Sequence, residues 1–520
     1  MTNPVLPPPT AFGLPGKFSQ WRENQDLACL SMTEPEPRFL LQVCPTGFGK
    51  SATYITAATL MEGRTAILTS TKGLQSQLMK DFGSMDGVVE IRGRGNYPCR
   101  LNTKVNCDSG LCMFGIKCDF KEGGGCFYFD AVRSALRAKV VITNYSYWTA
   151  QNEFSEGLGK FDLLVLDEAH SSPDHVIDHT SVQFSKGFKL EREILDLDDS
   201  LPNDADTWAV WAEEKLTDAK VELEYAKTHR KEKKFIHLKR LVEKLTRLVD
   251  RINRKWVWED NSFEVILTPT WPAPYCESVL FLGIPKVVLT SATVVPKTAH
   301  LLGIDSSHMK YEEYPHSFPL ESRPLIHLPT VRMNFRNGPV EERLWISKLD
   351  NIIRDRIGTK GIIHTVSYKR RDFVMENSRY SQHMVTHQRK DTESVVRAFK
   401  RAKAPTILVS PSMATGWDFP DDECRWQVIV KLPFPDTRGE IMKARSNQDK
   451  DYLSYVVMQQ LIQACGRGVR SETDWCETYL LDNNIQWFLK NNEHLCVEWF
   501  KGAYKVNPII PKPLGGKCGN

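Results

Sequence analysis

Short apolar segments, each followed by a turn and a helix-compatible stretch, recur along the chain and constrain its fold more than any other feature. Continuous apolar runs are typical of strands that are buried on both faces of a parallel sheet and connected by helices. The runs fall into two groups, before and after about residue 325: 38–50, 65–70, 140–144, 162–170 and 286–293, then 360–367, 405–412 and 427–435. This pattern predicts an α/β fold, and a chain of 520 residues should hold roughly three or four domains.

The composition is that of an ordinary soluble globular protein, with 41% apolar and 25% charged residues. Because the net charge is only +4, any contact with nucleic acid must come from local basic patches. The chain has no uncharged apolar run of about 18 residues, and its segment 1–18 lacks the features of a signal peptide. We therefore expect a cytoplasmic protein with no membrane contact.

Residues 183–262 differ from the rest because their apolar positions follow a helical period. The apolar positions, with Lys and Arg between them, are Leu238, Leu241, Val242, Leu245, Leu248, Val249 and Ile252. The segment is acidic near 191–206 and basic near 227–255. We interpret it as a helical insertion whose basic part is either a solvated helix face or a nucleic-acid contact.

The run CPTGFGKS, residues 44–51, follows an apolar strand and precedes a helix-compatible stretch. This order is typical of a phosphate-binding loop, in which backbone N–H groups and a helix N-terminus surround phosphate oxygens. Lys50 would reach the β and γ phosphates, Ser51 would bind Mg²⁺, and Gly47 and Gly49 would allow the tight turn. Cys44 stands where Gly or Ala is usual, and this departure is mild because the position requires only a small residue.

The run LLVLDEAH, residues 163–170, ends an apolar strand with two carboxylates. A carboxylate at the end of a strand, here Asp167, can hold Mg²⁺, and the next one, Glu168, can orient an attacking water. An Asp–Glu pair alone is more often a helix cap or a surface charge. Together with Lys50 the pair indicates phosphoryl transfer.

A second basic cluster lies in QLIQACGRGVRS, residues 460–471. The spacing of Gln463, Arg467 and Arg470 places the three side chains near one face of a helix. Arginines on a helix face are most often exposed to solvent. Here they follow the second group of strands, which has no phosphate loop of its own, so that unit could close over a nucleotide and supply arginine fingers.

Five of the 13 cysteines lie within 28 residues of one another: Cys99, Cys107, Cys112, Cys118 and Cys126. The scattered single cysteines elsewhere argue for a reducing compartment, in which such a cluster is typical of a metal site rather than of disulfides. Zinc sites usually have ligand pairs separated by two to four residues, whereas iron–sulfur clusters take four thiolates with looser spacing. The spacing alone leaves zinc and iron–sulfur comparable.

Five motifs occur in one order along the chain: CPTGFGKS, DEAH, LTSAT (289–293), SMATGWDFPDDECRWQVIVKLPFP (412–435) and QACGRGVR (463–470). This order resembles superfamily 2 helicases, and the flanks GRGNYPC and CFYFDAVRSALRAKVVITNYSYW resemble those of the iron–sulfur insertion in the XPD/DinG family. The resemblance covers most of residues 15–485. It is closest to compact members from bacteriophages or small prokaryotes.

The resemblance implies two RecA-like parallel-sheet motor domains with two insertions in the first. The first motor domain would comprise 1–92, 139–182 and 263–325, the iron–sulfur domain 93–138, the reduced arch-like helical insertion 183–262, and the second motor domain 326–520. The implied function is that of a monomeric ATP-dependent DNA helicase that moves 5′ to 3′ on single-stranded DNA and unwinds forked duplexes. Its replication or repair partners are not indicated.

The resemblance also implies roles for individual residues. Lys50 and Ser51 would be the Walker A pair with Thr46, Gly47 and Gly49 in the loop, and Asp167 and Glu168 the Walker B pair. His170, with Ser291 and Thr293 of motif III, would couple the γ-phosphate to strand binding. Further matches are Gly416 and Asp418 in motif V, Gln463, Arg467 and Arg470 in motif VI, and, more weakly, Arg22 and Gln25 as a nucleotide-reading Q motif.

For the cysteines, the resemblance favours a four-iron, four-sulfur cluster, with Cys99 and Cys126 as the outer ligands. The other two ligands would come from Cys107, Cys112 and Cys118. Two other functions stay open beside the DNA helicase. One is an RNA-directed helicase, and the other is a degenerate motor that serves as a scaffold or loading module, which the retained Lys50, Glu168 and arginines disfavour.

Overall fold

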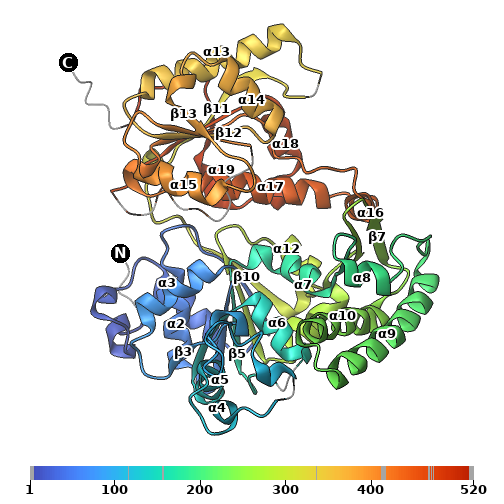
Figure 1. Ribbon diagram of the computed structural model, residues 1–520. Coiled ribbons are helices and arrows are strands. Elements are labelled where there is room, and N and C mark those ends of the chain that lie inside the picture. The colour runs from blue at the N-terminus through green and yellow to red at the C-terminus, as the bar shows by residue number, and fades with distance from the viewer. Residues whose placement is uncertain are drawn as a thin grey trace.

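The computed structural model describes residues 5–114, 116–154, 157–334, 336–411, 417, 419–466, 469, 471 and 473–514. The described chain forms two α/β units, one above the other in Figure 1, with a helical hairpin projecting from the lower one. None of the described helices combines the length and the apolar character that crossing a bilayer requires.

The first unit is built on a parallel sheet of seven strands in the order β10-β1-β9-β5-β2-β4-β3. The strands are β1 (Phe39–Val43), β2 (Thr65–Thr69), β3 (Val88–Glu90), β4 (Val140–Asn144), β5 (Leu163–Asp167), β9 (Lys286–Ser291) and β10 (Met309–Glu313). Strands β1 and β5 both pair with β9, so the residues after Val43, Asp167 and Ser291 emerge side by side at one sheet edge.

Helices cover both faces of this first sheet because adjacent strand residues point to opposite faces. Leu40 packs with the helices that follow the early strands, whereas Leu41 packs with those near β5 and β9. The helices of the unit are α1 (Gln25–Thr33), α2 (Lys50–Leu60), α3 (Lys72–Phe82), α6 (Tyr145–Phe154), α7 (Ser172–Thr180), α11 (Ala273–Cys276) and α12 (Pro296–Leu301).

The second unit holds another parallel sheet of seven strands, in the order β13-β14-β12-β15-β16-β11-β17. Its strands are β11 (Leu325–Val331), β12 (Gly361–His364), β13 (Met384–Thr386), β14 (Ile407–Ser410), β15 (Trp426–Ile429), β16 (Glu477–Asp482) and β17 (Tyr504–Val506). Its helices are α13 (Pro339–Arg356), α14 (Tyr368–Asn377), α15 (Thr392–Arg401), α16 (Glu440–Gln448), α17 (Tyr452–Cys465), α18 (Asn484–Asn491) and α19 (Glu498–Ala503).

Each of the eight apolar segments singled out in the sequence overlaps one of these strands, and the two parallel sheets confirm the predicted fold class. The continuous burial of β1, β2, β5 and β9 accounts for the success, because a strand covered on both faces shows no polar alternation.

The helical segment between β5 and β9 contains a long antiparallel hairpin, α9 (Ala205–Thr228) and α10 (Glu232–Arg251), preceded by α8 (Lys189–Ile194). Four of the apolar positions noted in the sequence, Leu238, Leu241, Leu245 and Leu248, are fully buried against α9 and a small sheet. That antiparallel sheet has the order β6-β8-β7, with β6 (Val182–Ser185), β7 (Trp256–Asp260) and β8 (Glu264–Pro269).

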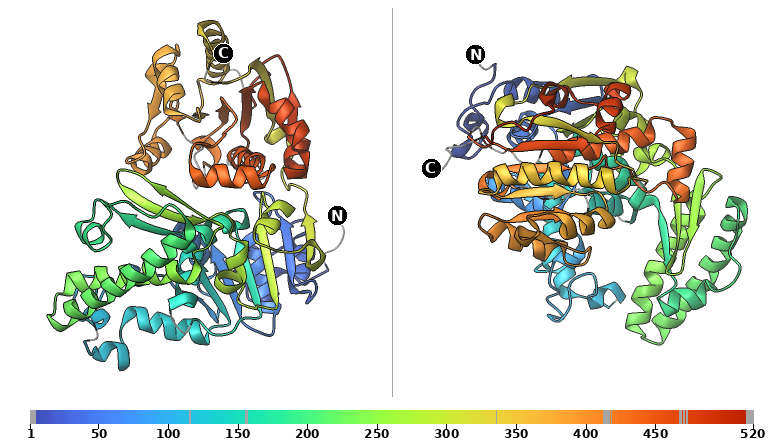
Figure 2. Two further views of the ribbon diagram at one scale, coloured as in Figure 1. Left: turned by 90° about the vertical axis from the view of Figure 1, so that its right-hand side faces the viewer. Right: turned by 90° about the horizontal axis from the view of Figure 1, so that it is seen from above.

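The cysteine-rich segment lies between β3 and β4 and contains α4 (Asp119–Glu122) and α5 (Phe127–Arg137). It projects to the same side of the molecule as the α9–α10 hairpin, as both views of Figure 2 show. The two projections meet, because Arg240 of α10 lies 3.9 Å from Asp108, and Ile116 lines a cavity together with residues 226–235 at the hairpin tip.

Candidate active site between the two sheets

The phosphate-loop sequence forms the turn between β1 and α2. Gly47 and Gly49 have φ angles of 84° and 89°, values in the left-handed region that favours glycine. Gly49 directly precedes α2, so the first N–H groups of that helix face the loop, as an anion site requires. Burial raises the pKa of the Cys44 thiol to about 12, so Cys44 is a neutral, small residue at the start of the loop.

Lys50, the first residue of α2, points to the end of β5. Its Nζ lies 3.2 Å from Oε1 of Glu168. Burial disfavours the charged ammonium, but Glu168 and Asp167 outweigh that effect and raise the pKa of Lys50. The two motifs that are separated by more than a hundred residues therefore form one charged site.

Asp167 is buried at the end of β5, and its carboxylate is linked to α2 through Tyr54. The Tyr54 hydroxyl lies 3.4 Å from Oδ2 of Asp167 and 3.2 Å from Oγ of Ser51. Burial, followed by the neighbouring Glu168 carboxylate, raises the pKa of Asp167 to about 7. Ser51 and Asp167, the two residues expected to hold Mg²⁺, thus lie on either side of one tyrosine hydroxyl.

Glu168 has a φ angle of 51°, a left-handed conformation that is costly for a residue with a side chain. The turn lets the backbone N–H of Glu168 donate to Oδ1 of Asp167 at 3.0 Å while its own carboxylate faces Lys50. The strained turn therefore points two consecutive carboxylates into the same site.

His170 connects this site to the second unit. Its Nδ1 lies 2.8 Å from Oγ of Ser291 and 3.3 Å from Nε2 of Gln463, and Gln463 also donates to Oγ1 of Thr293 at 2.7 Å. Ser291 in turn lies 3.4 Å from Oε2 of Glu168. The structure thus brings the DEAH, LTSAT and QACGRGVR motifs together in one polar network.

Arg22 and Gln25 contact the phosphate loop from outside. Gln25 Nε2 donates to the carbonyl oxygen of Phe48 at 2.6 Å, and the Arg22 side chain donates to the carbonyl oxygen of Gly47. The Arg22 backbone N–H donates to Oε1 of Gln25 at 2.7 Å, which fixes the orientation of the amide. These bonds hold the loop in shape.

The loop also contacts the second unit directly. Oγ1 of Thr46 donates to the carbonyl oxygen of Gly466 at 3.2 Å, next to the basic motif at the end of α17. Gly416, Asp418, Arg467 and Arg470, which the sequence also assigns to this site, lie outside the described residues.

Two contacts of the loop were not expected from the sequence. The ring of Phe318 lies so close to Gly47 that a Cβ atom there would come within 2.1 Å of it, and Phe318 is itself buried in the core of the second unit. The other unexpected contact is that of Tyr54, which follows Ser51 by three residues. This spacing places both side chains on one helix face, so the sequence could have indicated the contact. Phe318 lies in the connection between the units and has no comparable signal.

Two thiols of the cysteine-rich segment lie close to Gly110. A Cβ atom on Gly110 would lie 3.2 Å from Sγ of Cys99 and 3.8 Å from Sγ of Cys112. Burial and the neighbouring Cys126 and Cys99 thiols raise the pKa of Cys107 to about 12. Cys99, Cys107, Cys118 and Cys126 are buried, whereas Cys112 is partly exposed.

No group of three or more His, Cys, Asp or Glu side chains in the described ranges is arranged to hold a metal ion. A single tetrahedral zinc with bonds of about 2.3 Å needs thiolates within roughly 4 Å of one another. An iron–sulfur core is larger than one ion and holds its four thiolates further apart.

Comparisons with known proteins agree with this architecture. Residues 353–502 match the family model described as "Helicase C-terminal domain", and residues 18–191 match "Type III restriction enzyme, res subunit". A segment covering 19% of the chain is 25% identical over 122 residues to the ATP-dependent DNA helicase CHL1 of Saccharomyces cerevisiae, and it spans 14% of that protein's length.

Solved structures resemble most of the chain in fold. A chain titled XPD helicase aligns with a TM-score of 0.65 and 14% identity, covering 93% of this chain and 98% of its own length. A second, titled XPD apo, aligns with a TM-score of 0.62 and 14% identity over 94% of this chain and all of its own. At this identity the likeness concerns the fold.

Proposed function

We propose that the chain belongs to the XPD/DinG-like helicases of superfamily 2 and that it is an ATP-dependent DNA helicase that moves along single-stranded DNA. The proposed direction is 5′ to 3′, and the proposed work is the separation of forked duplexes. The observation that carries this proposal is the network in which His170 contacts both Ser291 of the first unit and Gln463 of the second.

ATP would bind between the units, with its phosphates on the N-terminus of α2. Lys50 would leave Glu168 and neutralise the β and γ phosphates, while Ser51 and Asp167 would hold Mg²⁺. Mg²⁺ supplies charge neutralisation at the reacting phosphate when it is bound. Glu168, freed from Lys50, would accept a hydrogen bond from the attacking water.

Closure of the two units would then depend on the γ-phosphate. The Thr46 hydroxyl already donates to the carbonyl oxygen of Gly466, so the phosphate loop touches the motif of the second unit that holds Arg467. We place Arg467 and Arg470 as the arginine fingers of this step, and Gly416 and Asp418 in the strand-coupling motif. Loss of the γ-phosphate would release the His170–Gln463 contact and let the units separate.

For the cysteine-rich segment we propose a structural four-iron, four-sulfur cluster held by four of Cys99, Cys107, Cys112, Cys118 and Cys126. The cluster would fix the fold of a segment whose described regular structure is limited to short helices. We also propose the division of the chain into motor domain 1 (1–92, 139–182 and 263–325), a cluster domain (93–138), a helical insertion (183–262) and motor domain 2 (326–520).

The test is an unwinding assay on iron-loaded protein with duplexes that carry a 5′ or a 3′ single-stranded overhang. The proposal expects ATP-dependent separation of the 5′-overhang DNA substrate and an ATPase rate that rises with single-stranded DNA. Preference for an RNA duplex would assign the protein to RNA instead. An ATPase rate that is indifferent to any nucleic acid would exclude a translocating motor.

A further inference from the structure

The two units meet at a largely buried group of side chains beside the phosphate loop. Three of them, His316, Phe318 and Arg323, belong to the connection between β10 and β11, and the fourth, Trp499, belongs to α19. We call this group the linker clasp. Phe318 is 3% exposed, and Arg323 and Trp499 are each 8% exposed. Solvent is therefore almost excluded from this part of the boundary.

Arg323 ties Phe318 to Trp499. Its Nε donates to the carbonyl oxygen of Phe318 at 3.4 Å, and its Nη1 donates to the carbonyl oxygen of Trp499 at 3.3 Å. The guanidinium also lies 5.7 Å from the centre of the Trp499 ring, within the range of a cation–π contact. Burial lowers the pKa of Arg323 to about 10, so the side chain is still charged at neutral pH. One cation thus fixes the position of Phe318 relative to Trp499.

His316 packs against both rings. Its ring centre lies 5.3 Å from that of Phe318 and 5.8 Å from that of Trp499, and its Nδ1 accepts a hydrogen bond from the backbone N–H of Phe318 at 3.1 Å. Burial, followed by the neighbouring Arg323, lowers the pKa of His316 to about 3. The ring is therefore neutral, and its Nδ1 remains an acceptor throughout the neutral pH range.

Phe318 joins the phosphate loop to the core of the second unit. Its ring packs with Phe399 and Leu408 in that core. The same ring lies against Gly47, where a Cβ atom would come within 2.1 Å of it. The shape of the phosphate loop therefore depends on a side chain whose other neighbours belong to the second unit.

Trp499 contacts two of the motifs that meet at the candidate active site. Its indole N–H donates to the carbonyl oxygen of Ala292 at 2.8 Å. Ala292 lies between the two residues of the LTSAT motif whose hydroxyls join the network with His170 and Gln463. The edge of the indole ring faces Gly466, where a Cβ atom would lie 3.7 Å from Cη2 of Trp499. Trp499 therefore sets the distance between the LTSAT and QACGRGVR motifs.

The helix that carries Trp499, α19, is anchored to the first unit at a second point. The backbone N–H of Glu498 donates to Oε1 of Glu313, the last residue of β10, at 2.5 Å. From there α19 runs directly into β17, the edge strand of the second sheet. A displacement of the first unit at Ala292 or Glu313 is thereby passed to the second sheet without an intervening loop.

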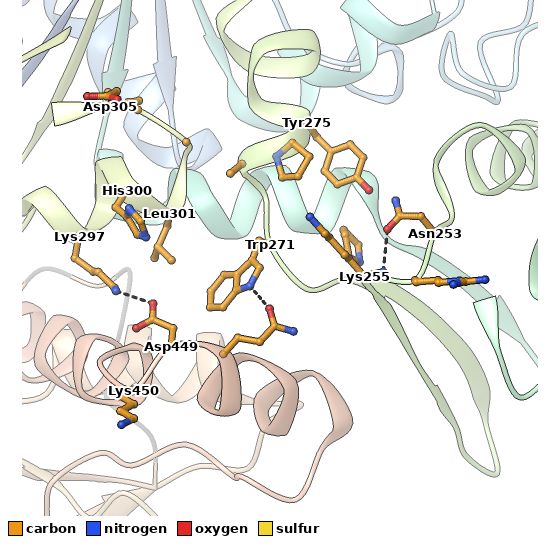
Figure 3. Close-up of a pocket in the computed structure, with 17 residues that line it drawn as sticks. Asn253, Lys255, Trp271, Tyr275, Lys297, His300, Leu301, Asp305, Asp449 and Lys450 are labelled. Carbon is orange, nitrogen blue, oxygen red and sulfur yellow. Dashed lines mark hydrogen bonds and ion pairs between the residues drawn. The ribbon is translucent and has the colours of Figure 1, made fainter. Parts of the chain in front are cut away.

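Elsewhere along the boundary, polar contacts flank a cavity of about 1380 Å³ (Figure 3). Lys297 of the first unit pairs with Asp449 of the second at 2.6 Å. The indole N–H of Trp271, which follows β8, donates to Oε1 of Gln448 at 2.7 Å. These four side chains are partly or fully exposed, so parting them would expose less apolar surface than parting the buried rings of the clasp. The linker clasp is therefore the firmer of the two contacts.

We propose that Phe318 and Trp499 are positioning residues for ATP turnover. Phe318 holds the phosphate loop in the shape that binds nucleotide, and Trp499 holds the LTSAT and QACGRGVR motifs at the distance that couples turnover to the strand. The proposal rests on the proposed function and extends it by naming two residues outside the motifs that link the nucleotide site to the second unit.

The role of Trp499 is tested by the ATPase rate with and without saturating oligo(dT). Trp499→Phe keeps a ring in the clasp but removes the donor to Ala292. The DNA-stimulated rate should fall roughly fivefold, the effect of one lost hydrogen bond, while the unstimulated rate and the KM for ATP stay at the wild-type values. The ratio of the two rates distinguishes this role from a loss of folded protein, which would lower both rates equally. The matched control is Trp345→Phe, a substitution of a buried tryptophan in α13 at the top of Figure 1, which should keep the wild-type ratio.

The role of Phe318 is tested by ATP affinity in the absence of DNA. Phe318→Leu weakens the contact with Gly47 and should raise both the KM for ATP in the unstimulated reaction and the Kd of a fluorescent ATP analogue. The expected factor is roughly three- to tenfold, which corresponds to at most about 1.4 kcal/mol of lost support for the loop. The matched control is Phe399→Leu, because Phe399 packs in the same core but belongs to α15 rather than to the connection between the units. It should leave both constants unchanged.

A wild-type ratio of rates in Trp499→Phe would overturn the role of Trp499, and wild-type constants in Phe318→Leu would overturn that of Phe318. Both results would leave the helicase proposal standing. A wild-type protein whose ATPase rate does not respond to oligo(dT) would overturn the helicase proposal and, with it, the role of Trp499. The Phe318 measurement needs no DNA and would still test the contact with Gly47.

Discussion

The ammonium of Lys50 lies 3.2 Å from the carboxylate of Glu168, although the two residues follow different strands of the first sheet. Each charge is thereby held at the position where phosphoryl transfer would use it, and each is balanced by the other. Entry of a phosphate must separate the pair, because Lys50 cannot hold Glu168 and the γ-phosphate equally well. The contact links nucleotide binding to release of the residue that is proposed to orient water.

Substitution of Lys50 and substitution of Glu168 should therefore have different effects on ATP binding and ATP hydrolysis. Lys50→Ala should abolish ATP hydrolysis and weaken ATP binding, because it removes the cation that holds the phosphates. Glu168→Gln should bind ATP at least as well as the wild type but hydrolyse it at least a hundredfold more slowly, on the order expected for loss of a group that positions or activates water. Turnover assays and fluorescent-nucleotide binding, with circular dichroism as the control for folding, test both. Normal hydrolysis by Lys50→Ala would exclude this site.

Binding of Mg²⁺ and ATP should depend on pH through Asp167. Its pKa of about 7 in this structure means that at pH 6 only about one-tenth of the carboxyl groups are ionised. Since Mg²⁺ requires the carboxylate, its binding should strengthen as the pH rises from 6 to 8 and should release a proton near pH 6. Calorimetry in buffers of different ionisation enthalpy measures that proton. Asp167→Asn should bind Mg²⁺ weakly at every pH, and an equally steep pH profile in this variant would assign the titration to another group.

Gln463 should couple the two units more than it supports hydrolysis itself. Gln463→Ala removes the donor to Thr293 and the contact with His170, and a single net hydrogen bond of about 1 kcal/mol corresponds to roughly fivefold in rate. We expect the DNA-stimulated ATPase rate to fall by about this factor while the unstimulated rate changes little. A double-mutant cycle with Thr293→Val should show coupling of at least about 0.5 kcal/mol. Additive effects would mean that the two side chains act independently.

The sequence predicted most of the fold because its strands are buried on both faces. The sequence did not indicate β16. All six residues of this strand are buried, but it begins with Glu477, and an acidic residue is not expected in a buried strand. Glu477 is tolerated there because Arg356 pairs with it, and no local pattern reveals a partner 121 residues away. The small antiparallel sheet was missed for another reason: β8 alternates buried and partly buried residues, but it lies within the segment that the helical period dominates.

The candidate site was predictable where its residues follow one another in a motif. Lys50, Ser51, Asp167 and Glu168 converge because parallel strands that are neighbours end at the same edge of a sheet. The contact of Phe318 with Gly47 was not predictable, because it depends on how the connection between the units packs.

Iron content gives a test of the cysteine-rich segment that is independent of activity. Protein purified without oxygen should be brown and contain about four irons per chain, whereas a colourless protein with one zinc would assign the segment to zinc. Cys99→Ser and Cys126→Ser should each lose most of the iron. Cys276→Ser is the matched control, because Cys276 is a buried cysteine of the first unit outside the segment. Among Cys107, Cys112 and Cys118, the variant that retains iron identifies the thiol that is not a ligand.

The buried pair of Arg356 and Glu477 should stabilise the second unit only while both partners are present. Each side chain is 1% exposed, and Arg356 also donates to the carbonyl oxygen of Pro511 at 3.0 Å. Arg356→Met should lower the free energy of unfolding by about 3–5 kcal/mol, because it leaves the Glu477 carboxylate buried without a cation. Arg356→Met/Glu477→Gln should recover a large part of that loss, since no unpaired charge is left. Urea denaturation followed by circular dichroism measures the stability of both variants. The control is Arg397→Met, which removes one partner of an exposed ion pair. It should change the free energy of unfolding by no more than about 1 kcal/mol. If Arg356→Met were as stable as that control, the pair would contribute no more than a surface ion pair does.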